Sequence, residues 1–179
     1  MSTNSILNRL KSYYYADLEL IELTETDINF ILGCIDTPDL DIRTMAATLI
    51  SQLPEPVIEK ILTLFPKFKK STQKQVVIHL MTISYLSPYR FLLNYLITLD
   101  DENMVNFIIT CLSKTQFELF PMILNKLGSE DMRYIGRLKQ LIRQIGFNRL
   151  ELYLKLMPQI PFEQYFRDVF GGDKINQLK

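Results

Sequence analysis

The stretch from Thr37 to Leu53 reads TPDLDIRTMAATLISQL, and it is the part of the chain that says most about the fold. Its apolar side chains recur every three or four residues, a spacing that places them on one face of an α-helix. That face is expected to consist of Ile42, Met45, Ala46, Leu49 and Leu53. Thr37 followed by Pro38 is typical of a helix start. The adjacent Ala46 and Ala47 leave room for a neighbouring helix to approach closely, so the stretch predicts a helix that packs against others.

The rest of the chain has the same character. It contains 179 residues, of which 47% are hydrophobic and 22% are charged, with 20 basic and 20 acidic side chains. Leu and Ile are frequent whereas Gly is rare, with only 6 residues, and this balance favours helices over β-sheet. We therefore expect a single all-α domain over residues 1–179. The neutral total also lacks the basic excess of a typical nucleic-acid binder.

Proline, glycine and capping residues divide the chain into short amphipathic segments of helical length. The predicted helices span residues 5–15, 25–35, 38–53, 55–65, 72–85, 88–99, 101–114, 116–127, 130–145, 148–157 and 162–170. Pro66 and Pro121 fall inside this pattern, and we expect a helix end or a kink at each because proline cannot donate a backbone hydrogen bond. Gly146 is expected to end a helix.

The predicted helices come in pairs that repeat every 29 to 34 residues or so. The pairs cover residues 5–35, 38–68, 72–99, 101–127 and 130–159, and a C-terminal cap follows at 161–172. One helix pair of this length cannot bury its apolar face alone, so successive pairs are expected to stack into an α-solenoid.

One unit resembles the first helix of a HEAT repeat. In that family an Asp-x-aliphatic-Arg start is followed by paired small residues and then Leu, as residues 41–49 read here. The match is specific over about fifteen residues, and the other four units share only the period. The resemblance implies a right-handed α-solenoid of about five HEAT-like pairs, and it implies no particular function.

The motifs of catalysis and cofactor binding are missing. There is no nucleophile elbow, phosphate loop or dinucleotide turn. His79 is the only histidine, which excludes a zinc site with several His ligands, and we expect it at the edge of the core. Asp100, Asp101 and Glu102 form an acidic cluster that would suit a cation, but capping of the next helix explains it better. We expect no enzyme activity, no metal and no cofactor.

Compartment signals are also missing. The first residues lack the basic and apolar regions of a secretory signal, and the longest uncharged stretch, from Gln75 to Tyr89, is too polar and too short for a membrane span. Cys34 and Cys111 both lie in apolar helical patterns and are expected to be small core residues rather than a disulfide. These features favour the cytoplasm.

Binding residues are predicted from the polar stripes of the second helices, which line one face in a HEAT-like stack. These candidates are Glu59, Thr63, Arg90, Asn94, Thr98, Glu118, Asn125, Glu151 and Lys155. The simpler interpretation is that these residues form ordinary solvated surface. The functional interpretation is that they form a ladder of residues of mixed charge across successive helices, which suits a protein partner. The three consecutive residues Tyr13, Tyr14 and Tyr15 cannot all face one side of a helix, so at least one is expected to be partly exposed as an interface anchor.

A basic patch is predicted on the helix at 130–145, from Arg133, Arg137, Lys139 and Arg143, opposite its apolar side. A solvated helix face is the simpler interpretation. The alternative is a docking patch for an acidic protein surface or a phosphate backbone.

The leading hypothesis is a non-catalytic protein that binds another protein through its solenoid surface. Bacterial immunity proteins, which neutralise a cognate toxin, are one class of small helical-repeat proteins without catalytic residues. One alternative is a nucleic-acid-binding protein similar to HEAT-like DNA glycosylases, but the chain has no Trp for an aromatic cage and no basic ladder. An adaptor, or a protein that attaches a cofactor as HEAT-like bilin lyases do, is the other alternative.

Overall fold

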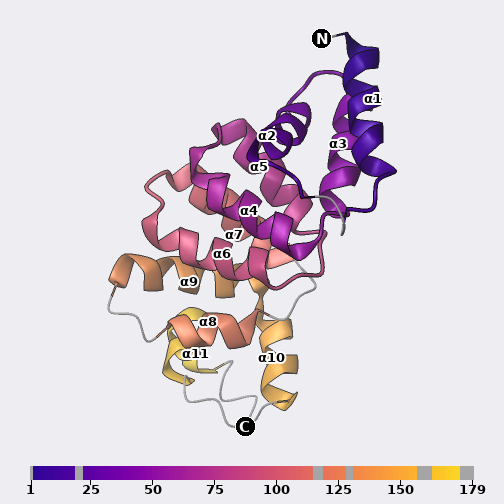
Figure 1. Cartoon of the computed structure of the whole chain (residues 1–179). Helices are drawn as coiled ribbons and strands as arrows, with labels where there is room; N and C mark the ends of the chain where they lie inside the picture. Colours follow the sequence, from indigo (N-terminus) through magenta and orange to yellow (C-terminus); the bar gives the residue numbers. More distant parts are fainter. Residues whose placement is uncertain (1, 19–21, 115–118, 128–130, 157–162, 174–179) are drawn as a thin grey trace. The chain divides into compact units, whose positions relative to one another are not determined.

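The computed structural model describes residues 2–18, 22–114, 119–127, 131–156 and 163–173. These residues form eleven α-helices and one short 3₁₀ helix, η1, and none of them lies in a strand (Figure 1). The helices are α1 (Thr3–Tyr14), α2 (Glu25–Cys34), α3 (Leu40–Ser51), α4 (Glu55–Leu64), η1 (Phe65–Lys67), α5 (Lys70–Leu80), α6 (Ser87–Thr98), α7 (Glu102–Lys114), α8 (Phe120–Lys126), α9 (Met132–Ile145), α10 (Phe147–Leu156) and α11 (Glu163–Phe170). The prediction of an all-α chain is confirmed.

Each predicted helix corresponds to one of these eleven, and in two of them an end differs from the prediction by more than two residues. The helix expected over 72–85 ends at Leu80, so the periodicity of residues 81–85 belongs to a turn. The helix expected over 116–127 begins at Phe120 in the described residues, which places Pro121 in its first turn, where a missing backbone N–H costs nothing. Thr115 and Ser129, whose short polar side chains would also suit helix caps, lie outside the described residues.

Helix ends follow local chemistry. Thr24 and Asp27 form a reciprocal capping box at the start of α2. The cap of α3 is the side chain of Asp39, which accepts from the backbone N–H of Asp41 and Ile42, and not the expected Thr37. The hydroxyl of Thr37 instead accepts from the backbone N–H of Asp39 at 3.4 Å, and the carboxylate of Asp39 suits the positive N-terminal end of the helix dipole.

Two predicted stops are confirmed. α9 ends at Gly146, whose φ of 92° lies in the left-handed region that favours glycine. α4 ends at Leu64, and the chain passes into η1, which contains Pro66. A proline in the next helical turn would have lost a hydrogen bond to the preceding turn.

The chain divides into two compact units, Met1–Phe91 and Leu92–Lys179, with the boundary inside α6. In the first unit α1 packs against α3, and α3 packs against both α2 and α5. Ala46 is fully buried on α3, while Ala47 is half-buried. Met45 was expected on the buried face, but it is partly exposed and Ile50 is buried instead.

In the second unit α9 is the central helix. It packs against α7, α10 and α11. Its buried residues include Leu138, Leu141 and Ile142. The phenol of Tyr134 is also buried and donates to the carbonyl oxygen of Leu93 at 3.1 Å, and this burial raises its pKa to about 12.

Candidate protein-binding groove

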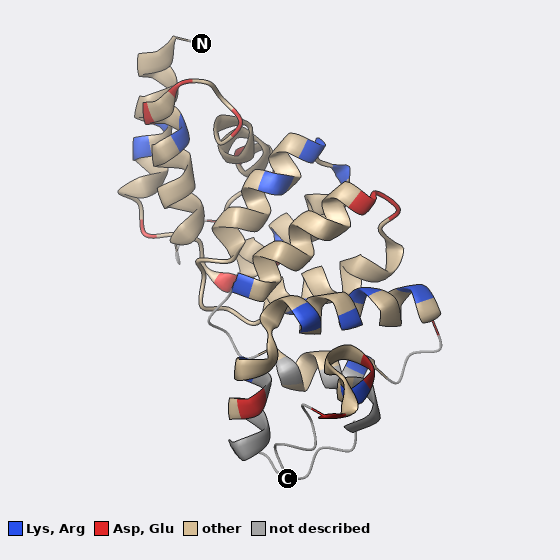
Figure 2. Cartoon of the chain, turned by 180° about the vertical axis from the view of Figure 1, so that it is seen from behind, with Lys and Arg blue, Asp and Glu red and all other residues tan. Residues whose placement is uncertain are grey.

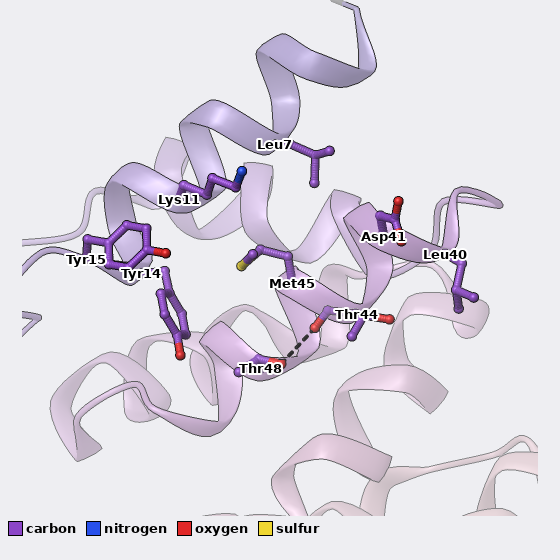
Figure 3. Close-up of a pocket in the computed structure, with 9 residues that line it drawn as sticks. All are labelled: Leu7, Lys11, Tyr14, Tyr15, Leu40, Asp41, Thr44, Met45 and Thr48. Atoms are coloured by element: carbon purple, nitrogen blue, oxygen red, sulfur yellow. Dashed lines mark hydrogen bonds between the residues drawn. The ribbon is translucent and has the colours of Figure 1, made fainter.

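The most distinctive surface of the first unit is a groove of about 650 Å³ between α1 and α3. Its walls come from two helices that lie side by side (Figures 1 and 3). The groove is lined by Leu7, Lys11, Tyr14, Tyr15, Leu40, Asp41, Thr44, Met45 and Thr48. Along each helix the lining residues recur at intervals of three or four, some of them in adjacent pairs such as Tyr14 and Tyr15, so each wall is one helix face.

Large apolar side chains are exposed at both ends of this groove. Tyr15, the C-terminal capping residue of α1, is 78% exposed, and Leu40, the first residue of α3, is 63% exposed. The ring of Tyr14 packs edge-on against that of Tyr15, with centroids 5.2 Å apart. Figure 3 shows Tyr14 and Tyr15 at one end of the groove and Leu40 at the other. The expectation that one of the three tyrosines is exposed is confirmed by Tyr15.

Two opposite charges face the groove from its two walls. Lys11 belongs to α1 and Asp41 to α3, and both side chains are exposed. Neither forms an ion pair with any other side chain among the described residues. The groove therefore offers one cation and one anion on walls that are otherwise largely apolar (Figure 3).

A polar network behind the groove holds α1 against α2. The hydroxyl of Tyr13 donates to Oδ1 of Asp27 at 2.5 Å, and Nη2 of Arg9 lies 3.2 Å from the same oxygen. The guanidinium of Arg9 also lies over the ring of Phe30, 4.0 Å from its centroid. Tyr13 is half-buried, and these contacts connect α1 to α2.

The hydrogen bonds of this network change the acidity of Asp27. The hydroxyl of Thr24 donates to Oδ2 of Asp27 at 2.6 Å. This bond, followed by the one from Tyr13, lowers the pKa of Asp27 to about 2. Donors that stabilise the carboxylate favour the charged form, so Asp27 stays ionised well into the acidic range.

The described ladder residues of the second helices are not among those that line this groove. Glu59 and Thr63 are exposed on α4, and Arg90, Asn94 and Thr98 are exposed along α6. Glu151 is partly exposed on α10. Glu118 and the side chains of Asn125 and Lys155 lie outside the described residues. The structure places the described ladder residues at the surface, and their role as a binding site stays a prediction.

Thr63 does line a second, smaller hollow of about 450 Å³ between α2 and α4. Its floor contains the buried side chains of Leu23 and Ile28. At its rim Nζ of Lys60 lies 3.6 Å from Oε1 of Glu22. Lys60 and Glu22 therefore form an ion pair with each other at the rim of this hollow, whereas Lys11 and Asp41 form no ion pair among the described residues.

The predicted basic patch on α9 needs correction. Arg137 is only 4% exposed, and its guanidinium donates to the carbonyl oxygen of Leu96 and to Oε1 of Glu102. Arg137 lies at the flank of the apolar stripe of α9, where residues of α6 and α7 cover it. A helical projection of α9 alone does not show these neighbouring helices. Arg137 is therefore a buried structural residue and not part of a free cationic surface.

Two other members of the patch are paired with acids. Arg133 lies 2.8 Å from Asp100 and 3.3 Å from Glu102, and Lys139 lies 2.9 Å from Asp168. Basic residues do recur along α9 (Figure 2), and Arg143 is exposed. Hydrogen bonds from Arg137 and Arg133 lower the pKa of Glu102, and ion pairs account for Asp100 and Glu102 of the acidic cluster. Asp101 caps α7, as expected, by accepting from two backbone N–H groups.

The groups with potential chemistry lie apart from the groove. His79 is half-buried, and desolvation lowers its pKa. Cys34 is buried, Cys111 is partly buried, and both thiols are free. Burial raises the pKa of each thiol, which makes both poor nucleophiles. Among the described residues, no three His, Cys, Asp or Glu side chains are grouped so that they would hold a metal ion.

Sequence reasoning found one component of the groove and missed the rest. The run of three tyrosines was a usable signal for an exposed anchor. Leu40, Met45 and Lys11 gave no such signal, because a helical projection assigns Met45 to the core and does not show which helix lies beside α3.

None of the helices in the described part of the chain is long and apolar enough to cross a membrane. Comparison of the chain with protein-family models, curated proteins and solved structures finds no match.

Proposed function

We propose that this chain is a non-catalytic HEAT-like repeat protein that binds another protein through the groove between α1 and α3. The observation that carries the proposal is the exposure of Tyr15 and Leu40 at the two ends of one hollow. Exposed large apolar residues that gather around a hollow are typical of protein-binding surfaces, and tyrosine is enriched among the residues that dominate binding energy.

The spacing of the polar contacts between helices supports the HEAT-like arrangement. In the first unit Ser71 bonds to Asp36, 35 residues away, and Ser87 bonds to Glu55, 32 residues away. In the second unit Gln140 bonds to Asn106 at a separation of 34 residues. These separations are close to the period predicted from the sequence, as expected if equivalent positions of successive helix pairs lie side by side.

Stacking within each unit supports the same arrangement. The first helices of successive pairs pack in order, with α1 on α3 and α3 on α5 in one unit and α7 on α9 in the other. The helix α11, predicted as a cap, packs on α9. On this basis we propose the α-solenoid as the architecture that displays the groove.

Nucleic-acid binding is the weaker alternative. A basic surface that binds phosphates needs cations that are free to replace counterions. On α9 the guanidinium of Arg137 is buried, and Arg133 and Lys139 each contact a carboxylate. A protein partner fits the described surface better.

Affinity capture with matched variants tests the proposal. Three tagged proteins are compared: the wild-type chain, a groove variant with Tyr15→Ser and Leu40→Ser, and a ladder variant with Glu59→Lys and Arg90→Glu. Each is used to capture material from extracts of cells that express the chain, with and without nuclease treatment. All four substituted residues are exposed, so the melting temperatures of both variants are expected to be nearly the same as that of the wild type. A protein recovered in stoichiometric amount by the wild type and the ladder variant, and lost from the groove variant, supports the proposal.

Two results would overturn it. Loss from the ladder variant alone would move the interface to Glu59 and Arg90. Recovery of nuclease-sensitive material instead of a protein would favour the nucleic-acid alternative. If the captured protein is an enzyme, inhibition of its activity by the chain tests the narrower hypothesis of an immunity protein that neutralises a toxin.

A further inference from the structure

We infer that the occupant of the groove is an amphipathic α-helix of the partner protein, with an acidic and a basic residue at the edges of its apolar ridge. This inference rests on the proposed function and specifies the partner. It follows from the shape of the groove, from the backbone of its walls and from its two charges.

The walls favour a helix over an extended peptide. All nine lining residues lie in α1, in α3 or at the C-terminal cap of α1. The backbone of these residues is helical and not extended, so the groove has no strand edge with which an extended peptide would pair. A helix satisfies its own backbone and needs only side-chain contacts. The furrow between two adjacent helices is also the shape into which the side-chain ridge of a third helix packs.

The apolar residues define the ridge that fits. Met45 lies in the middle of the groove, and Leu7 faces it from the other wall (Figure 3). Met is flexible and adapts to irregular apolar surfaces. Tyr15 and Leu40 then bracket the ridge at either end. A partner helix with Leu, Phe or Trp at positions i, i+4 and i+7 would cover these four side chains.

The charges define the edges of the partner helix. Lys11 and Asp41 are both exposed, face the groove and form no ion pair among the described residues. A helix that covers the groove brings its own side chains next to both charges. An acid opposite Lys11 and a base opposite Asp41 would give attraction on both walls, whereas like charges would give repulsion.

Three synthetic helical peptides serve as probes. Each carries the same Leu and Trp ridge and two flanking charges, which are Glu and Lys in the mixed probe, Glu and Glu in the acidic probe, and Lys and Lys in the basic probe. The chain contains no Trp, so the emission of the peptide tryptophan reports binding without interference. Each probe is titrated with the full-length chain at low salt, because exposed charge pairs are screened by salt.

The inference predicts a crossover of specificity. The wild-type chain binds the mixed probe most tightly. Lys11→Glu leaves two acidic groups in the groove and prefers the basic probe, while Asp41→Lys leaves two cations and prefers the acidic probe. We expect each preference to be about fivefold or more, since reversal replaces an exposed attraction with a repulsion. The matched controls Lys67→Glu and Glu59→Lys change the same charges outside the groove and should keep the wild-type order.

The two proposals fail in different ways. If no probe binds, or if the order of the probes is unaffected by Lys11→Glu and Asp41→Lys, the helical partner is wrong even when the capture experiment recovers a groove-dependent protein. If sedimentation shows that the chain alone forms a dimer that Lys11→Glu dissociates, the occupant is a second copy and the inference is overturned. If the probes show the crossover but capture recovers nothing, the groove binds helices and the proposed cellular role is wrong.

Discussion

The Nη2 atom of Arg137 lies 2.7 Å from Oε1 of Glu102, and the arginine is buried whereas the glutamate is exposed. The same guanidinium donates to the carbonyl oxygen of Leu96. One side chain of α9 thus satisfies groups of both α6 and α7, and it does so from a position that sequence patterning assigns to solvent. The stability of the second unit should depend on it.

Arg137→Ala is expected to lower the free energy of unfolding by about 1–3 kcal/mol, because the carbonyl oxygen of Leu96 loses its buried donor. Arg143→Ala removes an exposed arginine of the same helix and should change stability by no more than about 0.5 kcal/mol. Urea denaturation followed by circular dichroism measures both. Equal losses for the two variants would mean that the buried contacts of Arg137 contribute nothing.

Asp27 should make stability depend on pH in the acidic range. Its pKa of about 2 in the folded chain is below the value near 3.9 of an unfolded aspartate. The folded state therefore binds the proton less readily, so the stabilisation is present above about pH 4 and is lost as the pH falls towards 2. Asp27→Asn should be less stable than the wild type at pH 7, with a smaller further loss between pH 4 and 2.

Melting temperatures measured by circular dichroism from pH 7 to pH 2 test this expectation. Glu59→Gln, which neutralises an exposed carboxylate of the same unit, serves as the control and should follow the wild-type curve. An Asp27→Asn curve parallel to the wild type across the acidic range would contradict the assignment.

Tyr134 should make the stability of the chain depend on pH in the alkaline range. Its folded pKa of about 12 exceeds the ordinary tyrosine value near 10. The unfolded chain loses this proton first, so the contribution is fully present below about pH 10 and is lost as the pH rises towards 12. Tyr134→Phe should therefore lose less stability than the wild type between pH 10 and 12. Thermal melts at these pH values measure the loss, with Tyr15→Phe as a control at an exposed tyrosine. An equal loss of melting temperature in the wild type and in Tyr134→Phe would mean that the burial of Tyr134 has no effect on alkaline stability.

Ala46 marks a close helix crossing. It is fully buried on α3, which packs against α1, α2 and α5. Ala46→Leu should overpack this site and destabilise the chain by about 1–3 kcal/mol. Ala47 is half-buried, so Ala47→Leu should cost less. Chemical denaturation gives both values, and the reverse order would place the wrong alanine at the crossing.

Helix positions were predictable because their causes are local. The stop at Gly146 depends on that residue's own φ, and the end of α4 before Pro66 depends on a hydrogen bond that proline cannot make. The error at residues 81–85 has a physical reason too, since Ile83 is buried in a turn and not in a helix. The spacing of apolar residues indicates which residues are buried, and a buried residue in a short turn continues the spacing of the preceding helix. The sequence pattern therefore predicted one more helical turn than the structure has.

The groove was not predictable because its walls come from two helices whose relative position depends on packing. Tyr13 and Tyr15 are of one residue type and two positions apart, yet Tyr13 is partly buried by its bond to Asp27 and Tyr15 is exposed. A residue fourteen positions away decides the difference. No local pattern carries that information.

The amino-acid sequence by itself determined that the chain is helical and roughly where each helix lies. Those properties arise from hydrogen bonds and apolar spacing within four residues along the chain. Only the tertiary structure decided that Arg137 is buried, that Met45 lines a groove, and that Lys11 and Asp41 face it together. Those properties depend on contacts between residues that are far apart in sequence, and packing of whole helix faces selects them.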